Sequence, residues 1–193
     1  MKIIFSILLS SFFLFSCTDS GKPTGHSTEK DTTEKQKFFP VTAYLKGEIF
    51  NIKKSGVNPL KYTTVNEHTD SVWLKTEDLD AAVQEFLNPV IDSVNLITLF
   101  TEKSFMDQSI DAVTLTYDAT GILPDSMKLK HWDVYIYPQS GNVKRIYMVK
   151  EIDKAKTLQL TWVSNKWCKV TSIVTDDKGL TKIEKEEKLI WDF

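Results

Sequence analysis

The hydrophobic positions of this chain follow two different periods, and the period changes near residue 112. In residues 41–52, and again in residues 79–87, apolar side chains recur every three or four positions. This spacing places them on one side of an α-helix, so both segments are predicted to be helices that pack on a core. Between them, residues 60–74 have the composition and central turn of a short β-hairpin.

From Ala112 to Phe193 the period is two, which is typical of β-strands with one buried face. Clusters of turn-forming residues interrupt this alternation at residues 118–121, 138–141, 153–156, 164–166 and 176–179. The pattern therefore predicts a meander of neighbouring antiparallel strands. Residues 96–105, just before the meander, fit either an extended segment or a helical turn.

Two of these turns also predict which strand residues face each other. A three-residue loop at residues 139–141, with Gly141 in the left-handed conformation, aligns two apolar pairs, Val134 with Ile146 and Trp132 with Met148. On the opposite face, the same register pairs residues 131, 133, 135 and 137 with residues 149, 147, 145 and 143. A second loop, at residues 164–166, aligns Trp162 with Cys168 and Leu160 with Val170.

These elements predict an α+β fold, in which an antiparallel β-meander of about five or six strands carries two main helices packed on one face. Residues 38–193 have about the length of one globular domain, enough to bury a core. Residues 17–37 come before this predicted domain. From Thr18 onward they contain no aromatic or large aliphatic side chain, so they are predicted to form a disordered tether.

The chain begins with a short hydrophobic leader. Lys2 supplies a positive charge, residues 3–15 are mainly apolar, and the run ends in Leu14-Phe15-Ser16-Cys17. The run is too short to span a bilayer. It resembles the signal peptides of bacterial lipoproteins, which are cut before a lipid-modified cysteine. The resemblance implies that residues 1–16 are removed and that Cys17 becomes the first residue, acylated with chains such as palmitate.

Charge and cysteine content limit the classes of function. The formal net charge of −2 becomes −3 when residues 1–16, which contain one lysine and no acidic residue, are removed. No cluster of basic residues is evident, so nucleic acid is not an expected partner. Cys17 and Cys168 are the only cysteines, and acylation of Cys17 leaves Cys168 without a partner for an intramolecular disulfide.

The strand alternation gathers polar residues on the sheet face opposite the predicted helices. The members of this candidate binding face are His131, Asp133, Tyr135, Tyr137, Arg145 and Tyr147. Aromatic rings with polar tips can hold a sugar, a peptide or a partner protein, and Arg145 can pair with a carboxylate. The alternative is an ordinary solvated sheet face that is stabilised by cross-strand aromatic pairs.

No motif of established chemistry is present. The chain has no Gly-x-Ser-x-Gly sequence, no paired-histidine motif and no glycine-rich phosphate loop. We therefore assign no catalytic residue, and the sequence leans towards a protein that is not an enzyme. His131 and Asp133 share a strand face, but two ligands are too few for zinc, so neither a metal site nor a cofactor is expected.

The leader, the tether and strand motifs such as residues 132–137 resemble the small uncharacterised lipoproteins common in Bacteroidota, a resemblance that brings no known activity. It implies a cell-envelope protein anchored by lipid in the membrane, with the outer membrane favoured, at either its periplasmic or its surface face. The main hypothesis is a binding or accessory module whose partner is an envelope protein, a glycan or a lipid. Two alternatives stay open. One is a carrier of an apolar ligand in a curved-sheet cavity, and the other is an enzyme whose site residues converge only in the folded chain.

Overall fold

The computed structural model describes residues 37–192. The predicted signal peptide, residues 1–16, lies outside the described residues, as do Cys17 and all of the predicted tether except Lys37. Within the described part, no helix has the length and the hydropathy that crossing a bilayer requires.

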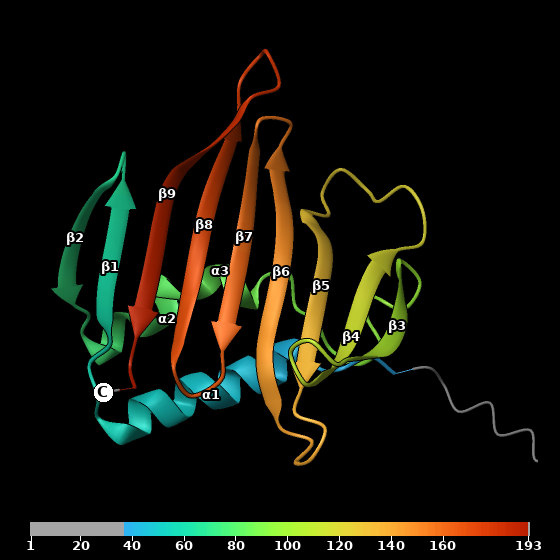
Figure 1. Ribbon diagram of the computed structural model, residues 1–193, viewed down its shortest axis with the longest axis horizontal. Coiled ribbons are helices and arrows are strands. Elements are labelled where there is room, and N and C mark those ends of the chain that lie inside the picture. The colour runs from blue at the N-terminus through green and yellow to red at the C-terminus, as the bar shows by residue number, and fades with distance from the viewer. Residues whose placement is uncertain (1–36, 193) are drawn as a thin grey trace, which may run out of the picture. The chain divides into compact units, whose positions relative to one another are not determined.

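An antiparallel β-sheet of nine strands forms most of the described structure (Figure 1). The strands lie in the order β2-β1-β9-β8-β7-β6-β5-β4-β3. Their bounds are β1 Leu60–Val65, β2 His68–Trp73, β3 Phe100–Asp107, β4 Ala112–Ala119, β5 Leu129–Ile136, β6 Val143–Asp153, β7 Lys156–Val163, β8 Trp167–Thr175 and β9 Thr181–Ile190. The hairpin of β1 and β2 therefore lies beside the last strand of the chain, because β1 pairs with β9.

The predicted fold of five or six strands with two main helices is wrong. The sheet has nine strands, because the hairpin of β1 and β2 and the segment that forms β3 all join the meander. Every residue of β2 is exposed, and most of β3 is exposed or half-buried. An edge strand hydrogen-bonds on one side only and supplies few side chains to the core, so its hydrophobic alternation is weak.

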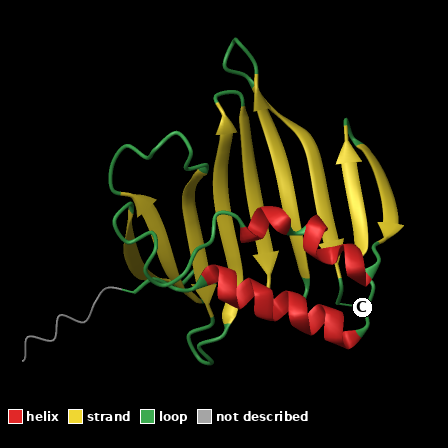
Figure 2. Ribbon diagram, turned by 180° about the vertical axis from the view of Figure 1, so that it is seen from behind, coloured by secondary structure: helices red, strands yellow, loops and turns green. Residues whose placement is uncertain are grey.

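One long helix and three short helical segments lie on one face of the sheet (Figure 2). α1 (Val41–Ser55) ends where Gly56 adopts the left-handed conformation, with φ 71°. The second predicted helix is instead broken into η1 (Thr76–Asp78), α2 (Leu79–Ala82) and α3 (Gln84–Leu87). The interruption is at Val83, whose φ and ψ of −107° and 9° are not helical.

The strand register agrees with the two predicted turns. Across β5 and β6, Val134 pairs with Ile146 and Trp132 pairs with Met148. Across β7 and β8 the two predicted pairs are also confirmed, Trp162 with Cys168 and Leu160 with Val170. On the opposite face residues 131, 133 and 135 pair as predicted, but the pairing of residues 137 and 143 is wrong. A register shift after Tyr135 pairs Ile136 with Val143, and Tyr137 lies in the turn.

Aromatic side chains fill the space between the sheet and the helices. The Trp132 ring stacks on the Tyr117 ring, with 4.5 Å between the ring centroids, and meets Phe100 edge-on at 4.7 Å. Phe86 of α3 meets Trp162 of β7 edge-on at 5.4 Å. All five side chains are fully buried. This interior is therefore a packed core, and such a core excludes water from apolar surface and stabilises the fold.

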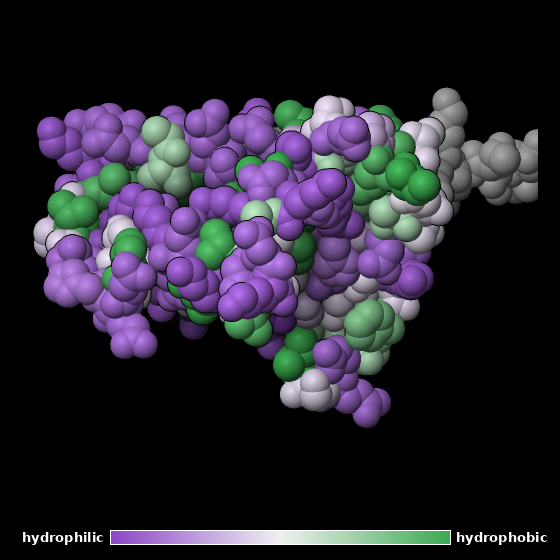
Figure 3. Space-filling model, turned by 90° about the horizontal axis from the view of Figure 1, so that it is seen from above, coloured by the Kyte–Doolittle hydropathy of each residue, from purple (hydrophilic) through white to green (hydrophobic). Residues whose placement is uncertain are grey.

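The two ends of the sheet differ in what surrounds them. α1 lies at the end that carries the β5–β6 and β7–β8 turns (Figures 1 and 2). The other end, which carries the β6–β7 and β8–β9 turns, shows mainly hydrophilic side chains, with hydrophobic ones in separate groups (Figure 3). Ile122 and Leu180 are exposed in loops at that end. Single exposed apolar residues of this kind are normal on protein surfaces.

Candidate functional site

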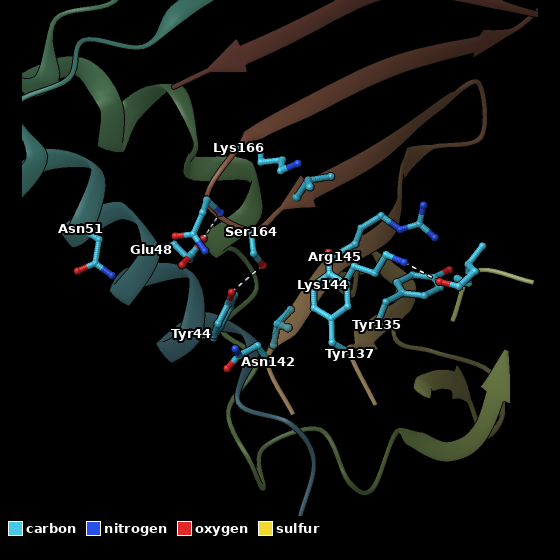
Figure 4. Close-up of a pocket in the computed structure, with 14 residues that line it drawn as sticks. Tyr44, Glu48, Asn51, Tyr135, Tyr137, Asn142, Lys144, Arg145, Ser164 and Lys166 are labelled. Carbon is cyan, nitrogen blue, oxygen red and sulfur yellow. Dashed lines mark hydrogen bonds between the residues drawn. The ribbon is translucent and has the colours of Figure 1, made fainter. Parts of the chain in front are cut away.

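A pocket of about 800 Å³ lies where α1 meets the turns at its end of the sheet (Figure 4). α1 forms one wall, the β7–β8 turn forms a second, and the ends of β5 and β6 form a third. Its lining includes Tyr44, Glu48, Tyr135, Tyr137, Lys144, Arg145, Ser164, Asn165 and Lys166. We call this site the edge pocket.

The α1 wall consists of polar residues on one side of the helix. Tyr44, Glu48 and Asn51 are spaced by four and three positions, which places them on a common face. The hydroxyl groups of Tyr44 and Ser164 are 2.7 Å apart and hydrogen-bond. Burial raises the pKa of the Tyr44 phenol above its ordinary value. This hydrogen bond holds α1 against the β7–β8 turn.

Glu48 is buried, and among residues 37–192 it is the one carboxylate in the pocket wall. One of its carboxylate oxygens accepts hydrogen bonds from the backbone N–H of Asn165, at 2.9 Å, and from the indole N–H of Trp162, at 3.4 Å. Two N–H donors therefore compensate the negative charge of this group. Glu48 acts as a structural link between α1 and the β7–β8 hairpin.

The sheet wall carries two cations packed against tyrosine rings. The Arg145 guanidinium carbon lies 4.0 Å from the centroid of the Tyr135 ring, and the Lys144 ammonium nitrogen lies 5.2 Å from that of Tyr137. Lys144 also donates a hydrogen bond of 2.6 Å to the backbone carbonyl of Ile110 in the β3–β4 turn. Such cation–π contacts hold both side chains in place.

The pocket has an excess of positive charge. Lys144 and Arg145 lie at the start of β6, and Lys166 lies in the β7–β8 turn. In residues 37–192 none of these three cations forms an ion pair with a carboxylate. The ion pairs of this part of the chain involve other residues, namely Lys53–Asp80, Lys61–Glu187, His68–Asp70, Lys103–Asp118, Lys130–Glu151, His131–Asp118, His131–Asp133, Lys150–Glu85, Lys156–Glu184, Lys169–Glu186 and Lys185–Glu187. A concave surface with an excess of one charge sign concentrates the potential inside it.

The candidate binding face predicted from the sequence is divided between two places. Tyr135, Tyr137 and Arg145 line the edge pocket. His131, Asp133 and Tyr147 do not line it, and they lie further along the outer face, which is the face opposite the helices. The His131 and Tyr147 rings meet edge-on, with 6.5 Å between their centroids.

His131 lies between two carboxylates. Its Nδ1 is 2.9 Å from Asp118 and its Nε2 is 3.2 Å from Asp133. The hydrogen bond with Asp133 is the largest cause that raises the pKa of His131, and the bond with Asp118 adds to it, while burial opposes both. We call these three residues and the groups that bond to them the His131 network.

Asp133 is the buried centre of the His131 network. It accepts a hydrogen bond of 2.7 Å from the Thr116 hydroxyl and one of 3.1 Å from the Tyr135 hydroxyl. Burial alone would raise the pKa of Asp133, but the hydrogen bonds from His131 and Thr116 outweigh it, so this pKa falls below its ordinary value. Tyr135 therefore joins the network to the edge pocket, since its ring also contacts Arg145.

Sequence reasoning missed the α1 wall, Lys144 and the β7–β8 turn as parts of a site. Tyr44 belongs to the apolar stripe that predicts the helix at residues 41–52, and the polar positions 48 and 51 beside it resemble an ordinary solvated helix face. Only the packing of α1 against the turn shows their role. Lys144 and Arg145 both reach the pocket, although neighbouring strand residues point to opposite faces, because the pocket lies at the end of the strand.

The described residues offer donors for a ligand and no cluster of metal ligands. No group of three or more His, Cys, Asp or Glu residues that could hold a metal ion occurs in residues 37–192. Cys168 is buried, and burial raises the pKa of its thiol, which disfavours the reactive thiolate. The chemistry that the edge pocket presents is thus hydrogen-bond donation, positive charge and aromatic surface.

The comparisons with known proteins found no similarity. No protein-family model, no curated protein and no solved structure matches the chain. The geometry of the edge pocket and the leader in the sequence are therefore the features that bear on function.

Proposed function

We propose that this protein is a lipid-anchored binding module of the cell envelope, held in the outer membrane through Cys17, with the edge pocket as its ligand site. The leader and its terminal cysteine support the anchor, because cleavage before Cys17 leaves a residue that can carry acyl chains. Stable anchoring needs two such chains or a second membrane signal.

The edge pocket carries the binding part of the proposal. Its volume of about 800 Å³ falls in the range of roughly 300–1,000 Å³ that is usual for small-molecule sites. Its walls combine tyrosine rings, hydroxyl and amide groups and three cations, and they come from one helix and three β-hairpins. Residues distant in the sequence thus converge on one concavity, as they do in ligand sites.

Two observations bear on the alternatives, one on catalysis at this pocket and one on the carrier of an apolar ligand. One oxygen of the Glu48 carboxylate accepts two N–H hydrogen bonds that link α1 to the β7–β8 hairpin, which supports a structural role for this group rather than a catalytic one. The space between sheet and helices, where a carrier would hold an apolar ligand, is filled by packed aromatic rings around Trp132. A polar ligand in the edge pocket is the function that these features support.

The proposal is tested by isolating the full-length protein from its own membrane and identifying the small molecules that accompany it by mass spectrometry. We expect a compound that co-purifies with the wild-type protein and is depleted from the Lys166→Met variant. Lys154→Met is the matched control, because it removes the same charge from the β6–β7 turn at the other end of the sheet. A compound retained equally by both variants, or no compound at all, would contradict the edge pocket as a ligand site.

The anchor is tested separately, by labelling cells with palmitate and comparing the wild-type protein with Cys17→Ser. We expect label on the wild-type protein and none on the variant, because the thiol at position 17 is the predicted acceptor. Equal labelling of the two proteins would contradict lipidation at Cys17.

A further inference from the structure

Some polar groups of the edge pocket already form hydrogen bonds within its wall, and others do not. One carboxylate oxygen of Glu48 and the hydroxyls of Tyr44 and Ser164 already take part in hydrogen bonds within the pocket wall. By contrast, the ammonium group of Lys166 makes no hydrogen bond and no ion pair within residues 37–192. The groups left for a ligand are therefore mainly donors, and donors require a ligand that accepts.

Cations also pack against two tyrosine rings of the pocket, which affects the kind of ligand that can bind there. One face of the Tyr135 ring contacts Arg145, and a face of the Tyr137 ring lies near Lys144. A neutral sugar binds chiefly by stacking on a free aromatic face, and here cations already cover such faces. The same cations carry unsatisfied positive charge, which favours a negatively charged ligand.

The size of the pocket favours an occupant larger than a bare inorganic ion. A single phosphate or carboxylate group occupies only a small part of about 800 Å³. The remaining volume is bounded by the helical wall at Tyr44 and Asn51 and by the amide of Asn142. An organic body with hydroxyl groups fits this surface, because hydroxyls both donate and accept hydrogen bonds.

From these features we infer that the edge pocket binds a small organic oxyanion, a polyol or sugar-like molecule that bears a carboxylate or phosphate group. The anionic group lies toward Arg145 and Lys166, and the polar body lies against the α1 wall. This inference rests on the proposed function, since it names the ligand class of the same pocket. The shared chemistry is the oxyanion, whether it is a carboxylate or a phosphate.

The test is a calorimetric titration of the full-length protein in non-ionic detergent at low ionic strength. Glucose 6-phosphate and glucuronate are the anionic probes, and glucose is the neutral probe of the same ring size. We expect both anions to bind at least about tenfold more tightly than glucose, because a hydrogen bond to a charged group contributes more than a neutral one. Of the two anions, the one that binds more tightly identifies the source of the oxyanion.

Two variants locate the binding. Lys166→Met is expected to weaken the binding of the anions about tenfold, whereas Lys154→Met, which has the same net charge, is expected to bind them like the wild type. Lys166 and Lys154 are both exposed and lie in turns, so neither substitution should disturb folding, and thermal melting curves check this.

The possible failures are distinguishable. Equal affinity for glucose and the anions, lost in Lys166→Met, would overturn the ligand class and keep the edge pocket as the binding site. Equal weakening by the two lysine variants would overturn both, since the anions would then respond only to net charge. Absence of binding by both anions would overturn the inference, and the membrane isolation described above would still decide the proposed function.

Discussion

The buried lysine of β6 provides a sharp test of how the helical layer is held on the sheet. The side chain of Lys150 is 3% exposed, and its ammonium group donates hydrogen bonds to the carboxylate of Glu85, at 2.8 Å, and to the Glu85 backbone carbonyl. The Glu85 side chain belongs to α3 and is 53% exposed. The cation of this pair is thus buried, whereas its partner is half in water.

This asymmetry predicts unequal costs for removing the two partners. Glu85→Ala leaves a buried ammonium with only a backbone carbonyl as its acceptor, and we expect it to lower the free energy of unfolding by about 2 kcal/mol. Lys150→Met removes the buried charge and keeps an apolar side chain of similar length, and its Glu85 partner can be solvated. We therefore expect Lys150→Met to cost less than about 1 kcal/mol.

Urea unfolding followed by tryptophan fluorescence measures both variants and the double variant. Because the two residues act as a pair, Glu85→Ala should cost almost nothing in the Lys150→Met background. Glu151→Ala is the matched control, since Glu151 pairs with Lys130 at 3.8 Å on the surface and its loss should cost less than about 0.5 kcal/mol. A larger cost for Lys150→Met than for Glu85→Ala would refute the reasoning.

Three further predictions concern the His131 network, the α1 wall and the core. The raised pKa of His131 stabilises the folded state fully below the ordinary His pKa of 6.5, and this stability is lost as pH rises through the pKa of His131 in the folded protein. The lowered pKa of Asp133 stabilises the folded state above the ordinary Asp pKa of 3.8, and this stability is lost as pH falls through the pKa of Asp133 in the folded protein. The difference in melting temperature between the wild type and His131→Gln should therefore be greatest between these two values, and a difference independent of pH would contradict the pairing. Glu48→Ala removes the acceptor for Trp162 and should destabilise by about 2 kcal/mol in urea unfolding, and Glu48→Gln, which keeps an acceptor, should cost about half of that. Trp132→Ala removes a fully buried ring and should cost about 3–5 kcal/mol by the same assay, whereas a cost below about 1 kcal/mol would show that the core around it is not packed as described.

The register of the central strands could be predicted because turn chemistry and side-chain alternation agree there. Gly141 takes a positive φ, and the three-residue turn at residues 164–166 aligns β7 with β8. The outer strands could not be placed from the same signals. β2 has no buried residue, and β3 buries only Phe100, so nothing in their hydrophobic pattern distinguishes a sheet edge from an exposed loop.

The candidate site was predicted in part, for a related reason. Alternation along β5 and β6 correctly groups Tyr135 with Arg145, because both belong to adjacent strands in a predictable register. The contributions of Glu48 and Lys166 depend on where α1 crosses the sheet, and no local pattern specifies that contact. The distance between these segments in the chain, 117 residues from Glu48 to Asn165, makes the contact purely tertiary.

The walls of the edge pocket come mainly from turns, strand ends and one side of a single helix, and they meet the tryptophan core at a few residues such as Val143 and Glu48. Residues such as Lys166 and Asn142 can then be substituted without altering strand register or core packing. Selection for a new ligand and selection for foldability therefore act on largely separate residues. In an evolving lineage this scaffold can diversify its specificity while the sheet stays the same.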